Sequence, residues 1–156
     1  MAYSQDIYNR IVAFLHDDDW KYEFDEEREV IKMGVSLKCK LKNTRVLIDL
    51  RETKYIAYAT VPLNADDDCK AEMTRLLNRI NWSMMFGNFE MDERDGEIRF
   101  RMPVNCACDG MPSRDIIRDS IVIPVLMVQK YGDAIVKVLM GACDWKTAYE
   151  ATEKKD

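Results

Sequence analysis

Apolar and polar residues alternate along this chain with two different periods, and each change of period marks a new segment. In residues 4–16 the apolar positions are three or four residues apart, which is the spacing of one helix face. They are Ile7, Ile11, Phe14 and Leu15. Ser4 is a suitable N-cap, and Asp17–Asp19 would lie unfavourably against the negative end of the helix dipole. We therefore expect a helix that begins after Ser4 and ends near His16.

Residues 29–43 alternate with period two, the pattern of a strand with one buried and one solvated face. The apolar face carries Ile31, Met33, Val35, Leu37, Cys39 and Leu41. The opposite face carries a row of lysines, Lys32, Lys38, Lys40 and Lys42. Shorter runs of the same kind occupy residues 44–52 and 54–63. The sequence thus predicts a three-stranded antiparallel meander with turns at Asn43-Thr44 and Glu52-Thr53.

The helical period returns in residues 64–86, where an apolar stripe follows a cluster of acidic residues. The stripe consists of Met73, Leu76, Leu77, Ile80 and Met84. Asp66–Asp68 would cap and complement the N-terminus of this helix, and Gly87 would end it in a left-handed conformation. Asn81 lies beside the stripe, so its amide needs a hydrogen-bond partner if it is buried.

A β-hairpin is predicted for residues 88–104, because two runs of period two flank Asp95-Gly96. Glycine tolerates the positive φ that a tight hairpin turn requires. The same stretch fails as a calcium loop, since Met91 and Met102 occupy positions that need oxygen ligands. The hairpin therefore adds two strands to the meander.

The last part of the chain has the helical period, with Ser113 as its capping residue. Pro124 is expected to kink or restart this helix, and Gly132-Asp133 is a second candidate break. Asp144 can cap a short terminal helix. The complete order is helix, three strands, helix, two strands, helix. It predicts an α+β fold in which helices pack on a five-stranded antiparallel sheet, within one domain formed by residues 1–156.

Composition and charge narrow the classes of function. With 156 residues, 47% of them hydrophobic, the chain can bury a core of its own. Its net charge of −5 argues against a nucleic-acid partner, and acidic residues on neighbouring strands interrupt the lysine row. No apolar run is long enough to span a membrane, and Asp6 precedes the first apolar positions, unlike in a signal peptide. We therefore predict a cytoplasmic protein with no nucleic-acid and no membrane partner.

Side chains with catalytic chemistry are few. The one histidine, His16, stands among acidic residues, where a solvated imidazole is expected. No glycine-rich phosphate loop or nucleophile elbow occurs, so we predict neither enzymatic activity nor a cofactor. Of the five cysteines, Cys106 and Cys108 form a closely spaced pair. A thiol-based redox or metal-binding protein that uses this pair is the alternative function, although no further metal ligands lie nearby in the sequence.

Ten methionines are an excess for a chain of this length, and methionine suits surfaces that bind varied peptides. The methionines between positions 73 and 102 mostly fall on faces that are predicted to be core. Trp82, Met85 and Phe86 fall off the stripe of the second helix. They are predicted to form an exposed apolar patch and are the candidate partner-binding residues.

The chain resembles a known family in four places, which are the Leu77–Asn81 helix end, Gly87–Glu90, the Asp95-Gly96 turn and the Tyr131–Gly141 segment. Together with the order of elements, these segments are similar to the YbjN-like family of bacterial sensory-transduction regulators. That family has the type III secretion chaperone-like fold. The resemblance extends over most of the chain, from Ile7 to Gly141.

The resemblance implies a small cytoplasmic protein that binds other proteins, forms a homodimer and has no defined catalytic residues. Its members are associated with stress response, motility or regulation. The pair Cys106 and Cys108, the lysine-rich first strand and the methionine and tryptophan excess around residues 82–86 depart from the family pattern. We therefore predict a non-enzymatic protein- or peptide-binding module, a chaperone-like regulator in signalling or stress response. The identity of its partner, its pathway and its dimer surface stay open.

Overall fold

The computed structural model describes residues 2–107 and 110–154 of the chain. Its elements, in order, are α1 (Gln5–Asp17), β1 (Glu23–Asp25), β2 (Val30–Ser36), β3 (Asn43–Leu50), β4 (Lys54–Thr60), α2 (Lys70–Asn81), β5 (Asn88–Met91), β6 (Ile98–Asn105), α3 (Arg114–Leu139) and α4 (Trp145–Glu153). The strand pairings are antiparallel, and the sheet order is β1-β2-β3-β4-β6-β5. The predicted α+β fold with its antiparallel sheet is confirmed.

The sheet has six strands where the sequence predicts five. The additional strand, β1, is a three-residue edge strand that pairs with the start of β2. Three residues are too few to show a period, so the hydrophobic pattern does not reveal it.

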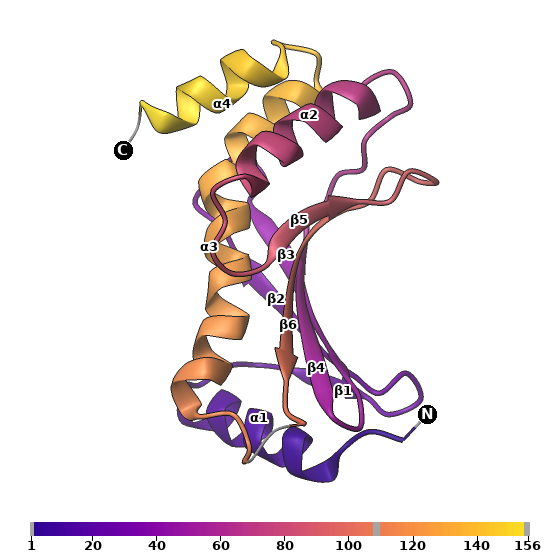
Figure 1. Ribbon diagram of the computed structural model, residues 1–156, viewed down its shortest axis with the longest axis vertical. Helices are drawn as coiled ribbons and strands as arrows, with labels where there is room; N and C mark the ends of the chain where they lie inside the picture. Colours follow the sequence, from indigo (N-terminus) through magenta and orange to yellow (C-terminus); the bar gives the residue numbers. More distant parts are fainter. Residues whose placement is uncertain (1, 108–109, 155–156) are drawn as a thin grey trace.

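One face of the sheet is covered by helices. α3 packs along this face against β3, β4 and β6, and α1 packs on α3 (Figure 1). α2 contacts α3, α4 and β5, so that α2 and α4 lie together at one end of the molecule. No helix of the described residues covers the opposite face of the sheet (Figure 1).

The strand register explains which side chains form the core. One row of cross-strand neighbours consists of Ile31, Ile48, Ala57 and Met102. The next row consists of Met33, Val46, Ala59, Phe100 and Phe89. All these residues are buried, and each large one contributes about 1.5–3 kcal/mol relative to an exposed position. The row between them carries Lys32, Leu47, Tyr58 and Arg101, which point to the uncovered face.

The long first strand of the sequence prediction is wrong in its second half, because β2 ends at Ser36 and residues 37–42 form a loop. The apolar members of this loop are still buried, since the loop docks on α3. The Lys38 N–H donates to Gln129 Oε1 at 3.0 Å, and the Lys40 N–H donates to Asp133 Oδ1 at 2.8 Å. The predicted row of lysines along the solvated sheet face therefore does not form.

The loop can approach closely because α3 has a glycine at the contact. A Cβ added to Gly132 would lie 2.6 Å from Cys39 Sγ. Packing thus explains this glycine, and α3 continues through it and through Pro124 without interruption. The predicted restart at Pro124 and break at Gly132-Asp133 do not occur, because burial of this helix on the sheet outweighs the lost hydrogen bond.

The first two helices follow the predicted stripes but differ in their ends. α1 is capped by Ser4 Oγ, which accepts the Ile7 N–H, and it ends close to His16 as predicted. α2 begins only at Lys70, after Cys69 as N-cap, so Asp66–Asp68 precede the helix without capping it. It ends at Asn81 and not at Gly87.

Candidate functional site

Residues 82–86, which we call the 82–86 segment, lead from α2 towards β5 and expose three large apolar side chains. The exposed fraction is 87% for Trp82, 88% for Met85 and 62% for Phe86. Exposed apolar side chains of this size are candidates for contact with a partner where they lie close together.

Both ends of this segment are fixed by the fold. Asn81 Oδ1 accepts the Phe89 N–H at 2.8 Å, and Asn81 Nδ2 donates to the Phe89 carbonyl at 2.9 Å. At the other end Gly87 has a φ of +69°, and an added Cβ would lie 2.5 Å from the Phe100 ring. A segment with anchored ends presents its side chains in place, which lowers the entropy lost when a partner binds.

Phe86 lines a groove of about 370 Å³ between the 82–86 segment, the end of β6 and the start of α3. We call it the Phe86 groove. Its apolar lining consists of Phe86, Met102, Pro103, Val104, Ile116 and Ile123. A mostly apolar hollow of this size can accept one or two side chains of a bound segment.

The Phe86 groove runs beside an open edge of β6, since β5 pairs only with residues 98–101. The Cys106 N–H donates to Thr53 on the β4 side. Because backbone groups alternate along a strand, residues 103 and 105 face the open edge. Residue 103 is a proline without an N–H, so this edge is a poor template for adding a strand. A partner in this groove would be held mainly through side chains.

Tyr55 lies behind the Phe86 groove in the core. Its hydroxyl is 2.8 Å from Ser120 Oγ, which itself donates to the Ile117 carbonyl at 2.7 Å. The Tyr55 hydroxyl therefore donates to Ser120. Burial raises the pKa of Tyr55 well above its ordinary value.

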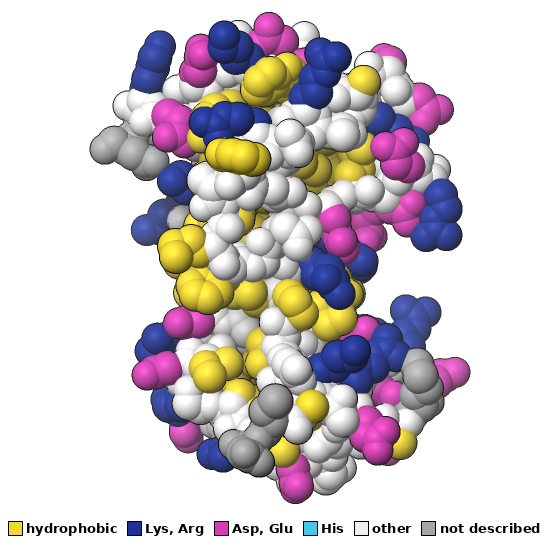
Figure 2. All heavy atoms as spheres, in the orientation of Figure 1, with side chains coloured by type: hydrophobic (Ala, Val, Ile, Leu, Met, Phe, Trp, Pro, Cys, Tyr) yellow, Lys and Arg dark blue, Asp and Glu magenta, His cyan; other side chains and the backbone are white. Residues whose placement is uncertain are grey.

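A second groove, of about 550 Å³, lies between α2 and α4. It is lined by Arg75, Asn78, Arg79, Trp82 and Trp145, and we call it the Arg–Trp groove. The four residues from α2 and its C-cap share one helix face because they are three or four positions apart. Figure 2 shows Lys and Arg side chains around hydrophobic ones at this end of the molecule.

The arginines of this groove keep positive charge available. The Arg79 guanidinium stacks over the Tyr149 ring, 4.4 Å from its centre, and takes part in no ion pair among the described residues. Arg75 reaches Glu72 only at 3.8 Å. The other carboxylate oxygen of Glu72 accepts the Trp145 N–H at 2.9 Å, which fixes the start of α4 against α2.

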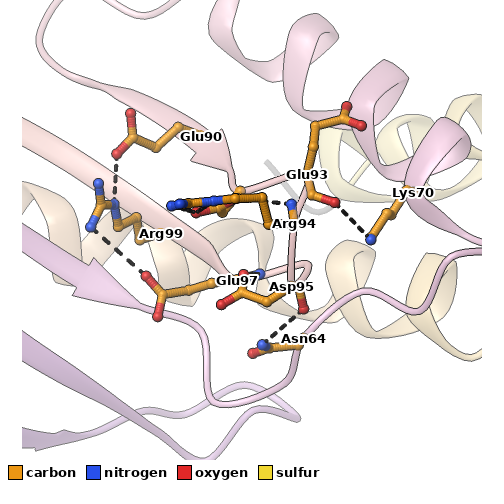
Figure 3. A network of polar contacts seen from close by, with 9 residues as sticks. Asn64, Lys70, Glu90, Glu93, Arg94, Asp95, Glu97 and Arg99 are labelled. Carbon is orange, nitrogen blue, oxygen red and sulfur yellow. Dashed lines mark hydrogen bonds and ion pairs between the residues drawn. The ribbon is translucent and has the colours of Figure 1, made fainter.

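Charges on the β5–β6 hairpin are, in contrast, paired with one another (Figure 3). Arg94 contacts Asp92 at 2.6 Å, and these hydrogen bonds lower the pKa of Asp92 to about 2. Arg99 contacts Glu90 at 2.6 Å. Lys70 of α2 donates to a carbonyl of the hairpin turn at 2.8 Å, so this network holds the hairpin to α2. Glu93 and Asp95 at the turn add two further acidic side chains, so the hairpin as a whole is acidic.

Metal-ligating side chains are not gathered into a site in the described part of the chain. It holds no cluster of three or more His, Cys, Asp and Glu residues suited to a metal ion. His16 is exposed and lies 3.2 Å from the Tyr22 hydroxyl. Burial raises the pKa of the Cys106 thiol, which disfavours the reactive thiolate. Cys108 lies outside the described residues, so the structure gives the thiol-based alternative no support.

The structure distributes the predicted candidate residues over two grooves. Trp82 lines the Arg–Trp groove, Phe86 lines the Phe86 groove, and Met85 lines neither of them. Sequence reasoning missed Arg75, Arg79 and Trp145. The helical spacing from Arg75 to Trp82 could have revealed the α2 face, but the contribution of α4 depends on the tertiary fold.

Comparison with known proteins finds this architecture elsewhere. A solved structure, "Crystal structure of YbjN, a putative transcription regulator from E. coli", is similar to this chain with a TM-score of 0.53 and 10% identity, over 80% of this chain and 93% of that chain. At this identity the similarity shows the fold alone. No curated protein matches the chain. Within the described residues, no helix has the length and apolar character needed to cross a membrane.

A family model identifies the group to which the chain belongs. The model is that of YbjN, "Putative bacterial sensory transduction regulator", and it matches residues 8–137. The match includes both strands of the hairpin, α2 and almost all of α3. Because it covers most of the sequence, the protein belongs to the YbjN family.

Proposed function

We propose that the protein is a non-enzymatic regulator that binds a protein or peptide partner through the 82–86 segment and the Phe86 groove. The supporting observation is the exposure of Trp82, Met85 and Phe86 on a segment whose two ends are anchored. Aromatic and methionine side chains are enriched where proteins bind one another. The description of the family as a regulator agrees with this function.

The Phe86 groove indicates the form of the partner. Its floor is apolar, and the adjacent β6 edge has a proline where strand addition would need a donor. We therefore expect a segment of the partner to insert apolar side chains between Phe86 and Ile116, as a chaperone-like protein binds its client. A cytoplasmic location and a homodimeric assembly belong to this proposal as predictions.

Site-specific photo-crosslinking in living cells tests the proposal. A photoreactive amino acid at Met85 should yield a crosslinked partner, and the same amino acid at Glu52, in the exposed β3–β4 turn, should not. W82S/F86S should remove contacts that the partner needs and so reduce the Met85 crosslink. Because both side chains are exposed, this variant should retain the wild-type circular dichroism and unfold within about 0.5 kcal/mol of the wild type.

Two results would count against the proposal. If the crosslinks from Met85 and Glu52 were identical, the 82–86 segment would have no preferred partner. If W82S/F86S lost its fold, the two side chains would be part of the core and not of a binding surface.

A further inference from the structure

The Arg–Trp groove combines an apolar surface with a cationic one. Trp82 and Trp145 provide large apolar faces, and Arg75 and Arg79 provide positive charge at the same groove. Arg79 has no ion pair among the described residues, and the contact of Arg75 with Glu72 is 3.8 Å long. The charged side chains that line the groove are these two arginines, although the chain has a net charge of −5.

The complementary ligand carries carboxylates close to an apolar side chain. Arginine presents several N–H donors in a plane and binds carboxylates in a bidentate manner, with specificity in both charge and direction. An aromatic or aliphatic side chain beside the carboxylate would pack against the indole rings. These rings provide a large apolar contact area and lose little side-chain conformational entropy on binding.

We infer that the Arg–Trp groove binds an acidic segment of a protein partner, in which Asp or Glu contacts Arg75 and Arg79 and a neighbouring apolar residue packs on Trp82 and Trp145. This inference rests on the proposed function, because it assigns a chemical class to the partner of the 82–86 segment. It adds specificity, since apolar surfaces alone discriminate poorly between partners.

A nucleic acid fits the groove less well, although its phosphates and bases would also meet arginine and tryptophan. A polyanion must extend beyond one pair of arginines, and acidic residues lie beside the groove. Glu72 contacts Arg75 and the start of α4, and Asp144 caps α4 next to Trp145. Short acidic segments avoid this repulsion because they place only one or two carboxylates in the groove.

A displayed library of short random peptides, selected on the full-length protein at low salt, tests the inference. We expect selected peptides to carry Asp or Glu next to Trp, Phe or Leu. A selected peptide, made synthetically with a fluorophore, should bind R75Q/R79Q roughly tenfold or more weakly than the wild type in an anisotropy titration. R75K/R79K should bind with intermediate affinity, since lysine keeps the charge but lacks the planar donors.

Two controls separate a site-specific effect from a change in net charge. R10Q/R28Q removes two exposed arginines from α1 and the β1–β2 turn, changes the net charge equally and should not alter binding. The amide analogue of the peptide has Asn for Asp and Gln for Glu. It should bind the wild type weakly, and R75Q/R79Q should reduce its affinity little further. If R75Q/R79Q does not fold, R75Q alone with the amide analogue gives the same comparison.

The other outcomes each overturn the inference. Selected peptides without acidic residues, whose binding needs Phe86 but neither arginine, would leave the proposed function standing and refute this site. A library that yields no binding peptide would overturn both the proposed function and the inference about the Arg–Trp groove. Binding of a single-stranded oligonucleotide that is lost in R75Q/R79Q, without peptide binding, would make the ligand a nucleic acid. Self-association of the wild type that R75Q/R79Q abolishes would identify a second copy of the chain as the occupant.

Discussion

Substitution of Asn81 by alanine tests whether its side chain holds the 82–86 segment in place. The Asn81 amide makes two hydrogen bonds with the backbone of Phe89, at 2.8 and 2.9 Å. Each contributes about 0.5–1.5 kcal/mol, so N81A should lower the free energy of unfolding by about 1–3 kcal/mol. The Phe89 carbonyl also accepts from Asn88 Nδ2 at 3.1 Å, which places the expected cost near the middle of this range.

Urea unfolding followed by circular dichroism measures the global effect, and amide hydrogen exchange of Phe89 measures the local one. N81A should accelerate this exchange, because the N–H loses its acceptor. N81D keeps an acceptor for the N–H and should protect it, although its second oxygen then faces the Phe89 carbonyl. N78A, an exposed position on the same helix, is the matched control. An N81A protein within 0.5 kcal/mol of the wild type, with unchanged exchange at Phe89, would refute the anchoring role.

Three further predictions concern the hairpin and the core. G96A should lower the free energy of unfolding in urea by more than about 2 kcal/mol, because φ is +76° and the added Cβ would meet the Ala65 carbonyl oxygen. G141A is the control: φ is +65° but the space around it is open, so it should lower the free energy of unfolding only by the roughly 1–2 kcal/mol of the left-handed conformation. Y55F removes the hydroxyl that bonds to Ser120 and should lower the free energy of unfolding by about 1 kcal/mol at neutral pH. Since burial raises the pKa of Tyr55, the wild type should lose stability above pH ~10, where the unfolded tyrosine ionises, and Y55F should lack that part of the alkaline slope. The pKa of Asp92 is lowered from 3.8 to about 2, so its stabilising contribution is present above pH 3.8 and disappears as the pH falls through 2. The difference in free energy of unfolding between the wild type and D92N should vanish over the same interval.

The sequence predicts the fold well wherever one face of an element is buried over its whole length. Period two identifies most of the sheet, and the helical stripes identify α1 and α2 with their buried residues. The pattern fails at residues 37–42, because a loop that docks on a helix can bury alternate side chains as a strand does. At β1 the reverse holds, because a strand is present without a hydrophobic period. Hydrogen bonding to β2 defines this strand.

The candidate site could be predicted only in part. Trp82, Met85 and Phe86 stand out because they lie off the apolar stripe of α2, and all three are exposed. Their environment could not be read from the sequence. Trp145 reaches the Arg–Trp groove through the packing of α4 on α2, and Ile116 reaches the Phe86 groove through the packing of α3 on β6. Both contacts join residues that are far apart in the chain.

The position at which α2 ends determines whether the exposed side chains make one surface or two. In a helix that continued to Gly87, as the sequence pattern predicts, Trp82 and Phe86 would be four residues apart on one face and would share their surroundings. The helix ends at Asn81, so Trp82 stays with Arg75 and Arg79, whereas Phe86 turns to β6 and α3. The hydrogen bonds of Asn81 to Phe89 thereby separate a cationic groove from an apolar one, and a partner must satisfy both chemistries at a fixed spacing to bind across them.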